Sequence, residues 1–168
     1  MKEATVAGGC FWCVEAALKE VPGVSDTTVG YAGGDVEDPD YEEVCTGETG
    51  HAEAVRVEYD PEEITYRELL EVFFSIHDPT TRDREGPDVG SQYRSAVFYH
   101  DEEQEETVRE VIDELESRVE GEVVTEVEEL DGFYPAEEKH QDYFEKHPDR
   151  PYCQAHVKPK VEKVRDRF

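Results

Sequence analysis

A strand-to-helix junction near the start of the chain constrains the fold more than any other stretch of the sequence. The β-type run from Ala4 to Ala7 ends at two glycines, and an amphipathic segment from about Cys10 to Glu20 is predicted to form a helix. Cys10 then lies among backbone N–H groups without intrahelical partners, which stabilise a thiolate over a thiol. Because cysteines in such positions have pKa values of roughly 3.5–7.5 instead of about 8.5, we predict that Cys10 is a nucleophile.

Two aromatic residues follow this cysteine. Phe11 and Trp12 offer an apolar wall next to the sulfur atom, and Trp12 is the only tryptophan of the chain. A structural role is the alternative, because free cysteines are often buried and inert and aromatic residues at a helix start often belong to the core. This stretch alone leaves both interpretations open.

Length and charge limit the class of the protein and its partners. We expect one domain spanning residues 1–168, and no run approaches 18 consecutive apolar residues. The chain starts almost directly in its first strand without an apolar leader, so we expect a cytoplasmic protein without a membrane span. The formal net charge of −27, from 44 acidic and 17 basic residues, argues against nucleic acid or an anionic membrane as partner.

The acidic residues are spread along the chain and not confined to one tail. They recur from Asp35 to Glu43, from Asp101 to Glu106 and on to Glu138, whereas lysines are sparse. Such a surface resembles that of proteins from organisms with molar salt in the cytoplasm, because its self-repulsion is screened when the Debye length falls to about 3 Å at 1 M salt. We therefore predict a halophilic source and a stability that rises with KCl. Generic acidic solubility is the alternative.

The four cysteines point to metal or redox chemistry. A chain without an export signal is not expected to carry structural disulfides. Zinc would need four grouped ligands, but only Cys10 and Cys13 form a CxxC pair, and Cys45 and Cys153 stand alone. We therefore expect no metal site.

Hydrophobic periodicity predicts alternating strands and helices. Helices with one apolar stripe are predicted from Thr65 to His77 and from Glu103 to Val119. A polar, aromatic helix is predicted from Ala136 to Lys146, and the tail from His147 to Phe168 shows little periodicity. Strands are expected at about 4–7, 24–31, 52–59, 95–100 and 123–130, with one helical turn at 41–45. This order predicts an α+β two-layer sandwich with a mixed, mainly antiparallel sheet, a ferredoxin-like core and a loop-rich C-terminal tail.

Glu53 is the candidate acid. In the strand predicted at 52–59 it shares a face with Val55, Val57 and Tyr59, which makes this face the buried one. Burial disfavours the charged carboxylate and raises its pKa, which suits a general acid near neutral pH. A glutamate that bends out to solvent at the strand end is the alternative.

Several blocks of sequence resemble the A-type peptide methionine sulfoxide reductases. They follow one another in order and cover nearly the whole chain, from Gly8 to about Lys160. The blocks are Gly-Cys-Phe-Trp-Cys-Val-Glu at 9–15, Val-Gly-Tyr-Ala-Gly-Gly at 29–34, Tyr-Glu-Glu-Val-Cys-Thr-Gly at 41–47, Gly-His-Ala-Glu-Ala-Val at 50–55, His-Asp-Pro at 77–79, Gly-Ser-Gln-Tyr-Arg-Ser at 90–95 and Lys-His-Pro at 146–148. One short motif would be a weak signal, but this many in order is a strong one.

The resemblance implies a reaction. The cysteine that matches Cys10 attacks the sulfur of methionine S-sulfoxide, which releases methionine and leaves a sulfenic acid on the enzyme. The residue that matches Glu53 protonates the departing oxygen, and such general acid catalysis is typically worth roughly 10²–10⁴-fold in rate. The resemblance assigns the remaining contacts by position: the oxygen is held by Tyr41, Tyr93 and Asp88, directly or through water, and the S-methyl group is received by Phe11 and Trp12.

The resemblance also implies that a second cysteine captures the sulfenic acid and that thioredoxin then reduces the disulfide. Many members have glycine in place of Cys13 and resolve with a C-terminal cysteine, which Cys153 resembles, whereas others use the CxxC partner. Helix geometry favours Cys13, because CxxC at a helix N-terminus can close a disulfide with little movement. We expect Cys153 as the first resolving cysteine, with Cys13 as alternative or relay. Cys45 matches a cysteine that turnover does not need and is expected to be a small buried hydrophobe.

The resemblance implies protein repair after oxidative damage, with free methionine sulfoxide or oxidised proteins as substrates. We expect a monomer with no cofactor apart from thioredoxin as external reductant. Two other classes remain. A general dithiol oxidoreductase would use Cys10 and Cys13 but would not explain a buried Glu53 or the tyrosines. A redox-sensing or metal-binding module is the non-enzymatic alternative.

Overall fold

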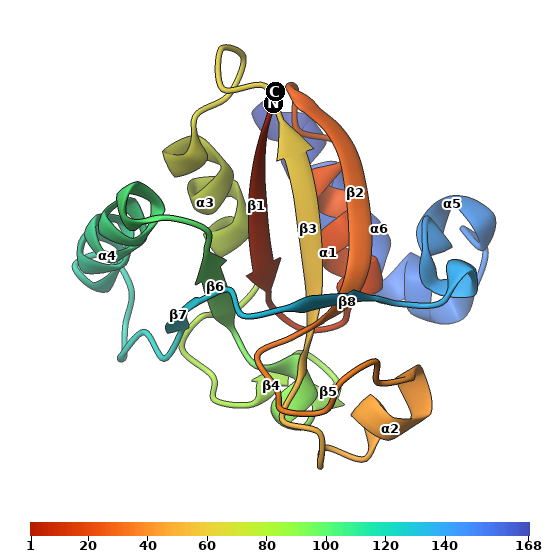
Figure 1. The fold of residues 1–168 in the computed structure, drawn as a ribbon. Coiled ribbons are helices and arrows are strands. Elements are labelled where there is room, and N and C mark those ends of the chain that lie inside the picture. The colour runs from red at the N-terminus through yellow and green to blue at the C-terminus, as the bar shows by residue number, and fades with distance from the viewer.

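The computed structural model describes residues 1–168 and contains one six-stranded sheet (Figure 1). Its strand order is β7-β6-β1-β3-β2-β8. All neighbouring pairs are antiparallel except β6 and β7, so the predicted mixed, mainly antiparallel sheet is confirmed. The strands are β1 (Lys2–Ala7), β2 (Val24–Ala32), β3 (Ala52–Tyr59), β6 (Ala96–Tyr99), β7 (Glu126–Glu129) and β8 (Phe133–Pro135).

A short connection makes the sheet curl. Strands β7 and β8 lie at opposite edges, but only residues 130–132 join them. The four peptide units between Glu129 and Phe133 span at most about 14 Å, so the two edges approach each other. Small side chains on the inner face leave room for the curl, since Phe98 packs there against Ala7, Ala32, Ala52, Ala54 and Ala96. Figure 1 shows this connection crossing in front of the sheet.

Helices cover the other face. In Figure 1, α1 (Phe11–Leu18), α3 (Tyr66–Ser75) and α6 (Lys158–Arg167) lie behind the strands, and their buried side chains join those of the sheet in one apolar core. The predicted helices at 65–77 and 103–119 are confirmed as α3 and α4 (Glu102–Glu116). Helix α3 begins where the Thr65 side chain accepts the N–H of Glu68. None of the helices has the length and apolar character that crossing a bilayer requires.

The C-terminal tail is helical, which corrects the expectation of a loop-rich tail. A π-helical turn over Cys153–Val157 continues directly into α6. Val157, Val161 and Val164 recur at helical spacing on one side and are fully buried. These three are the only apolar residues between 157 and 167, and the other positions are mostly charged, so the sequence carried a weak periodic signal.

The prediction of one helix from Ala136 to Lys146 is wrong, because two shorter elements occupy this segment. These are a 3₁₀ turn, η2 (Glu138–His140), and α5 (Tyr143–Lys146), separated by Asp142 with a positive φ of 55°. Tertiary contacts override the local helix propensity here. The side chain of Gln141 bonds to both backbone groups of Val29 at 2.9 Å, and the N–H of Asp142 donates to Glu15 at 2.9 Å.

Candidate active site

The candidate site is built at the turn between β1 and α1. Gly9 has a φ of +91°, which favours glycine, and a Cβ there would collide with the side chain of Glu85. The N–H of Gly9 donates to the carbonyl of Tyr93 at 3.2 Å, so this turn is tied to the loop that follows α3. Cys10 is the N-cap of α1, where the sequence places it.

Cys10 is buried, and burial reverses the expected direction of its pKa. Removal from water raises the pKa of the Cys10 thiol well above its usual value, and the neighbouring Cys13 and Glu53 raise it further. The backbone N–H of Trp12 lowers the pKa of Cys10, as expected at a helix N-terminus, but this effect is smaller. The resting side chain is therefore a neutral thiol and not the predicted thiolate.

Glu53 lies close to Cys10 with its carboxyl group in the protein interior. It is 1% exposed, and its Oε1 atom accepts the N–H of Phe11 at 3.1 Å. Its Oε2 atom is buried without any hydrogen-bond partner. Burial raises the pKa of Glu53 to about 8, so the carboxyl group is mostly protonated at neutral pH. The buried face predicted for this strand is present, and one carboxyl oxygen is free to act on a ligand.

Two tyrosines approach this carboxyl group from separate segments. Tyr41 begins α2 (Tyr41–Cys45), the helical turn that the sequence predicts, and Tyr93 ends the 3₁₀ turn η1 (Ser91–Tyr93). Burial, followed by the negative charge of Glu53, raises the pKa of both phenols. Both are therefore neutral hydroxyl donors close to Glu53.

Asp88 lies on a small hairpin, β4 (Arg84–Glu85) and β5 (Asp88–Val89), between α3 and η1. The hydroxyl of Tyr152 donates to Oδ2 of Asp88 at 2.6 Å and lies 3.7 Å from the sulfur of Cys13. Tyr152 was not predicted as a site residue, and its position next to Cys153 is the only signal that could have indicated it.

Cys10, Cys13 and Cys153 are buried, and each thiol affects the pKa of the next. Cys13 interacts with Cys10, and this interaction is the largest influence that lowers the pKa of Cys13. Cys153 lies wholly buried in the π-helical turn, and burial followed by the proximity of Cys13 raises the pKa of its thiol. All four cysteines are free thiols. Cys45 is exposed, which corrects the expected burial, because only Val44 of the short helix α2 reaches the core.

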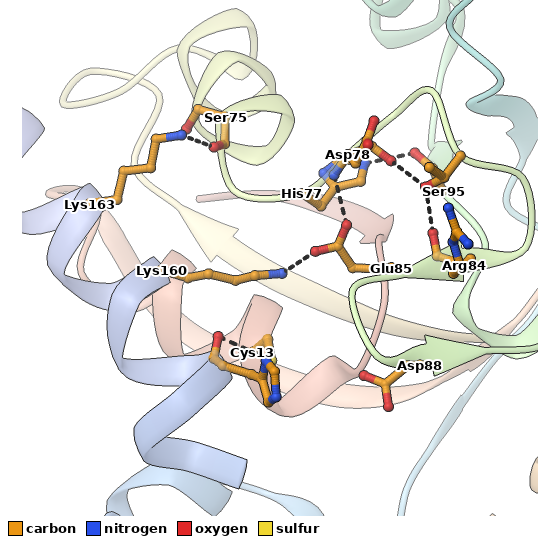
Figure 2. Close-up of polar contacts among 12 residues, drawn as sticks. Cys13, Ser75, His77, Asp78, Arg84, Glu85, Asp88, Ser95, Lys160 and Lys163 are labelled. Carbon is orange, nitrogen blue, oxygen red and sulfur yellow. Dashed lines mark hydrogen bonds and ion pairs between the residues drawn. The ribbon is translucent and has the colours of Figure 1, made fainter.

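An ion pair ties the tail to the hairpin. Figure 2 shows Lys160 extending from α6 to Glu85, with 2.6 Å between Nζ and Oε2. The other carboxyl oxygen of Glu85 accepts the N–H of Asp78 at 2.8 Å. Besides the interaction with Cys10, the positive charge of Lys160 lowers the pKa of Cys13. Neither member of this pair was predicted from the sequence.

The aromatic wall predicted beside the sulfur is present but largely covered. Phe11 is fully buried and Trp12 half-buried. The indole of Trp12 stacks on Tyr143 with 3.7 Å between ring centroids, and its N–H donates to Nδ1 of His140 at 3.3 Å. His140 and Tyr143 come from the segment where the predicted helix is interrupted, and no sequence pattern indicated their role.

These features define a thiol-based reductase. A cysteine at a helix N-terminus lies near a protonated carboxyl group that can donate to a leaving oxygen, and a second thiol is close enough to influence the pKa of the first. No group of three or more His, Cys, Asp and Glu side chains is arranged to hold a metal ion.

Comparison with known proteins agrees with this class. The family model of the peptide methionine sulfoxide reductases matches residues 2–168. A peptide methionine sulfoxide reductase MsrA from Halobacterium salinarum is 60% identical over 167 residues, which cover 98% of this chain and 94% of the relative. The reduced form of Mxr1 from Saccharomyces cerevisiae has a TM-score of 0.87 at 38% identity, covering 92% and 90% of the two chains. Mxr1 in complex with Trx2 has a TM-score of 0.60 at 30% identity and covers 84% of each chain.

The chain therefore belongs to the peptide methionine sulfoxide reductase family. It reduces methionine (S)-sulfoxide to methionine at the expense of thiols. The resemblance drawn from the motifs is confirmed, and the high identity to a Halobacterium protein supports the halophilic source predicted from the charge.

Proposed function

We propose that Cys10 attacks the sulfoxide sulfur while Glu53 protonates the departing oxygen, and that thioredoxin recycles the resulting intramolecular disulfide. The observation that supports this assignment best is the state of Glu53. Its carboxyl group is buried, fixed through Oε1 by the N–H of Phe11, and leaves Oε2 without a partner. With a pKa of about 8, the group carries at neutral pH the proton that the departing oxygen receives.

In the first step, a bond forms between the Cys10 sulfur and the substrate sulfur. Burial disfavours a resting thiolate, so attack and proton transfer are coupled: Glu53 gives its proton to the sulfoxide oxygen, and the resulting carboxylate takes up the proton of the Cys10 thiol. The hydroxyls of Tyr41 and Tyr93, with Asp88, hold this oxygen, and Phe11 and Trp12 contact the methyl group. The protonated oxygen then moves from the substrate sulfur to the Cys10 sulfur as the bond between the two sulfurs breaks. This leaves methionine, which is reduced by two electrons, and a sulfenic acid on Cys10, which is oxidised by two.

In the second step, a thiol displaces water from the sulfenic acid. The family resemblance favours Cys153 for this role, whereas the CxxC spacing at the helix N-terminus favours Cys13. The mutual influence of the thiols supports Cys13 as first partner, because Cys10 affects the pKa of Cys13 and Cys13 affects the pKa of Cys153. Exchange with Cys153 then moves the disulfide to Cys13 and Cys153 and restores the Cys10 thiol. Thioredoxin reduces this last disulfide. The solved complex of the related Mxr1 with Trx2 supports this choice of reductant.

The substrate is methionine S-sulfoxide, free or within oxidised proteins. We infer that residues 1–168 act as one reductase domain, as a monomer in the cytoplasm, where four free cysteines remain reduced. We also infer a ferredoxin-like core of β1, α1, β2, β3, α3 and β6, which the strand order β6-β1-β3-β2 supports.

Turnover of separate S and R epimers of a methionine sulfoxide peptide in molar KCl tests this function. We expect reduction of the S epimer alone. Without reductant, wild type should release one equivalent of methionine as the Cys13–Cys153 disulfide forms and a second equivalent from the restored Cys10 thiol. Cys13→Ser should release one equivalent only and retain a sulfenic acid, detectable with dimedone. Cys153→Ser should also release one equivalent only and stop at the Cys10–Cys13 disulfide.

Two outcomes would contradict parts of the scheme. A Cys153→Ser variant that retains the sulfenic acid would make Cys153 the first resolving residue. If the protein reduces neither epimer although Cys10 still reacts with iodoacetamide, the proposed sulfoxide mechanism is wrong.

A further inference from the structure

One segment near the C-terminus differs in charge from the rest of the chain. Residues 146–160 contain four basic residues and one acidic residue, a net charge of +3. The other positions hold 43 acidic and 13 basic residues, a net charge of −30. A difference of this size within one small domain indicates an electrostatic role for the segment. We call residues 146–160 the basic segment.

The positive side chains of the basic segment are mostly exposed. The carbonyl of Arg150 accepts the N–H of Gln154 at 3.0 Å, so Arg150 lies at the start of the helical tail. Arg150, Gln154 and Lys158 follow one another at intervals of four residues and are all exposed, which places them on one side of this helix. Lys158 approaches Glu162 at 3.9 Å, and exposed pairs of this kind contribute little. Both positive charges are therefore available to a partner.

The basic segment surrounds the thiol of Cys153. Burial raises the pKa of this thiol, and the charge of Arg150, which lowers it, acts from nearby. In the proposed cycle Cys153 ends in a disulfide with Cys13, and the reductant must attack one of these two sulfurs. Cys13 is the better leaving group, because Cys10 and Lys160 lower its pKa whereas that of Cys153 is raised. Attack at Cys153 is therefore favoured, and it brings the reductant against the basic segment.

The exchange needs no group besides the two thiols of the reductant. One reductant thiolate bonds to the Cys153 sulfur while the bond between Cys153 and Cys13 breaks, and Cys13 leaves as a thiolate that takes up a proton. The second reductant thiol then displaces Cys153, which also ends protonated. The reductant loses two electrons and two protons and becomes a disulfide, and this chain gains both.

We propose that the basic segment is the docking surface for a negatively charged dithiol protein, which attacks the sulfur of Cys153. This docking role rests on the proposed thioredoxin cycle and adds to it the charge of the partner and the surface that receives it. A reductant from the same salt-rich cytoplasm is expected to be as acidic as this chain. The remaining surface repels such a partner, whereas the basic segment attracts it.

The test reverses two charges at two different places. Arg150→Glu/Lys158→Glu reverses the two exposed charges that flank Cys153. The matched control, Arg109→Glu/Arg118→Glu, changes the net charge by the same amount at two exposed positions on and just after α4. Figure 1 shows α4 on the opposite side of the molecule from α5, which ends where the basic segment begins. The two double variants therefore differ only in where the charge is reversed.

Turnover of the S-sulfoxide peptide is driven either by a thioredoxin of net negative charge or by dithiothreitol, which is small and mostly uncharged. The assay uses the lowest KCl concentration at which circular dichroism shows all three proteins folded. In Arg150→Glu/Lys158→Glu, kcat/KM for thioredoxin should fall about tenfold or more, and in the control it should stay within about twofold of wild type. The loss should shrink as KCl is raised, because the Debye length shortens. Turnover with dithiothreitol should not change in either variant.

A thioredoxin that lacks its second cysteine stops at the mixed disulfide, and peptide mass spectrometry identifies the cysteine to which it is bound. We expect Cys153. A mixed disulfide on Cys13, or an equal loss in the two double variants, would overturn the proposal. An equal loss with dithiothreitol would also overturn it, because the charges would then act on the thiols and not on docking. If wild type reduces the S epimer with neither reductant, the proposed function fails instead.

Discussion

The hydroxyl of Tyr152 donates to Asp88 at 2.6 Å while lying 3.7 Å from the sulfur of Cys13. This one side chain connects the loop hairpin, the catalytic helix and the tail that carries Cys153. Tyr152, next to Cys153 in the sequence, therefore contacts both Asp88 and the Cys13 thiol, so the residues proposed for substrate binding and for resolution are physically linked.

Removal of the Tyr152 hydroxyl should slow the first chemical step. In Tyr152→Phe, Asp88 loses a charge-assisted hydrogen bond, which fixes its orientation toward the proposed position of the sulfoxide oxygen. We expect methionine release in a single turnover without reductant to slow about tenfold. Tyr99→Phe, on β6 away from the site, is the matched control. Equal single-turnover rates in wild type and Tyr152→Phe would show that Asp88 does not need this bond.

Activity should fall as the pH rises through the pKa of Glu53. The protonated carboxyl is the active form, and its pKa is about 8, so the proton is present below this pH and is lost above it. We expect single-turnover rates of wild type to decline above pH 8. Glu53→Gln should lower them roughly 10²–10⁴-fold and abolish this decline. A decline that persists unchanged in Glu53→Gln must come from another group.

The same group should make stability depend on pH. The folded-state pKa of Glu53 is about 8, whereas a glutamate in an unfolded chain titrates near about 4.3, so the folded state binds more protons between these values. Its contribution to stability is complete below the lower value and is lost as the pH rises through about 8. Urea unfolding from pH 5.5 upward should show a fall of up to about 1.4 kcal/mol per pH unit in wild type relative to Glu53→Gln. Parallel curves for the two proteins would show that Glu53 is ionised in the folded state.

The sequence predicted those site features that depend on local periodicity. The burial of Glu53 follows from alternation along β3, and the helix N-cap position of Cys10 follows from two glycines before an amphipathic run. Both patterns are local, so neither needs knowledge of the tertiary packing.

Features created by distant segments were not predictable in this way. The pKa of Cys10 depends on burial by the whole fold, which outweighs the local effect of the helix terminus. His140 contacts Trp12, 128 residues away in sequence, and Tyr152 contacts Asp88, 64 residues away. Cys45 is exposed because α2 is too short to bury it. Such positions depend on tertiary contacts, which produce no periodic pattern in the sequence.

Lys160 should promote thiol exchange at Cys13. Its positive charge lowers the pKa of Cys13, so Lys160→Met should raise this pKa and move the rate of alkylation of the Cys13 thiol toward higher pH. Lys163→Met is the matched control, because Lys163 lies on the same helix but bonds to the Ser75 carbonyl (Figure 2). The measurement is iodoacetamide labelling against pH in a Cys10→Ser background. Identical profiles for the two lysine variants would show that Lys160 acts only through its ion pair with Glu85.

The surface charge should make folding depend on salt. With 44 acidic and 17 basic residues, and with the acidic first turn and outer face of α4 exposed, the folded state concentrates negative charge that water alone screens poorly. Raising KCl from about 0.1 M to 1 M shortens the Debye length from about 10 Å to 3 Å, which weakens this repulsion. We expect the melting temperature to rise across this range and activity to rise with it. Sucrose stabilises by exclusion without screening charge, so it should not reproduce the increase in activity at low salt. A melting temperature that does not change with KCl would mean that the acidic surface serves solubility alone.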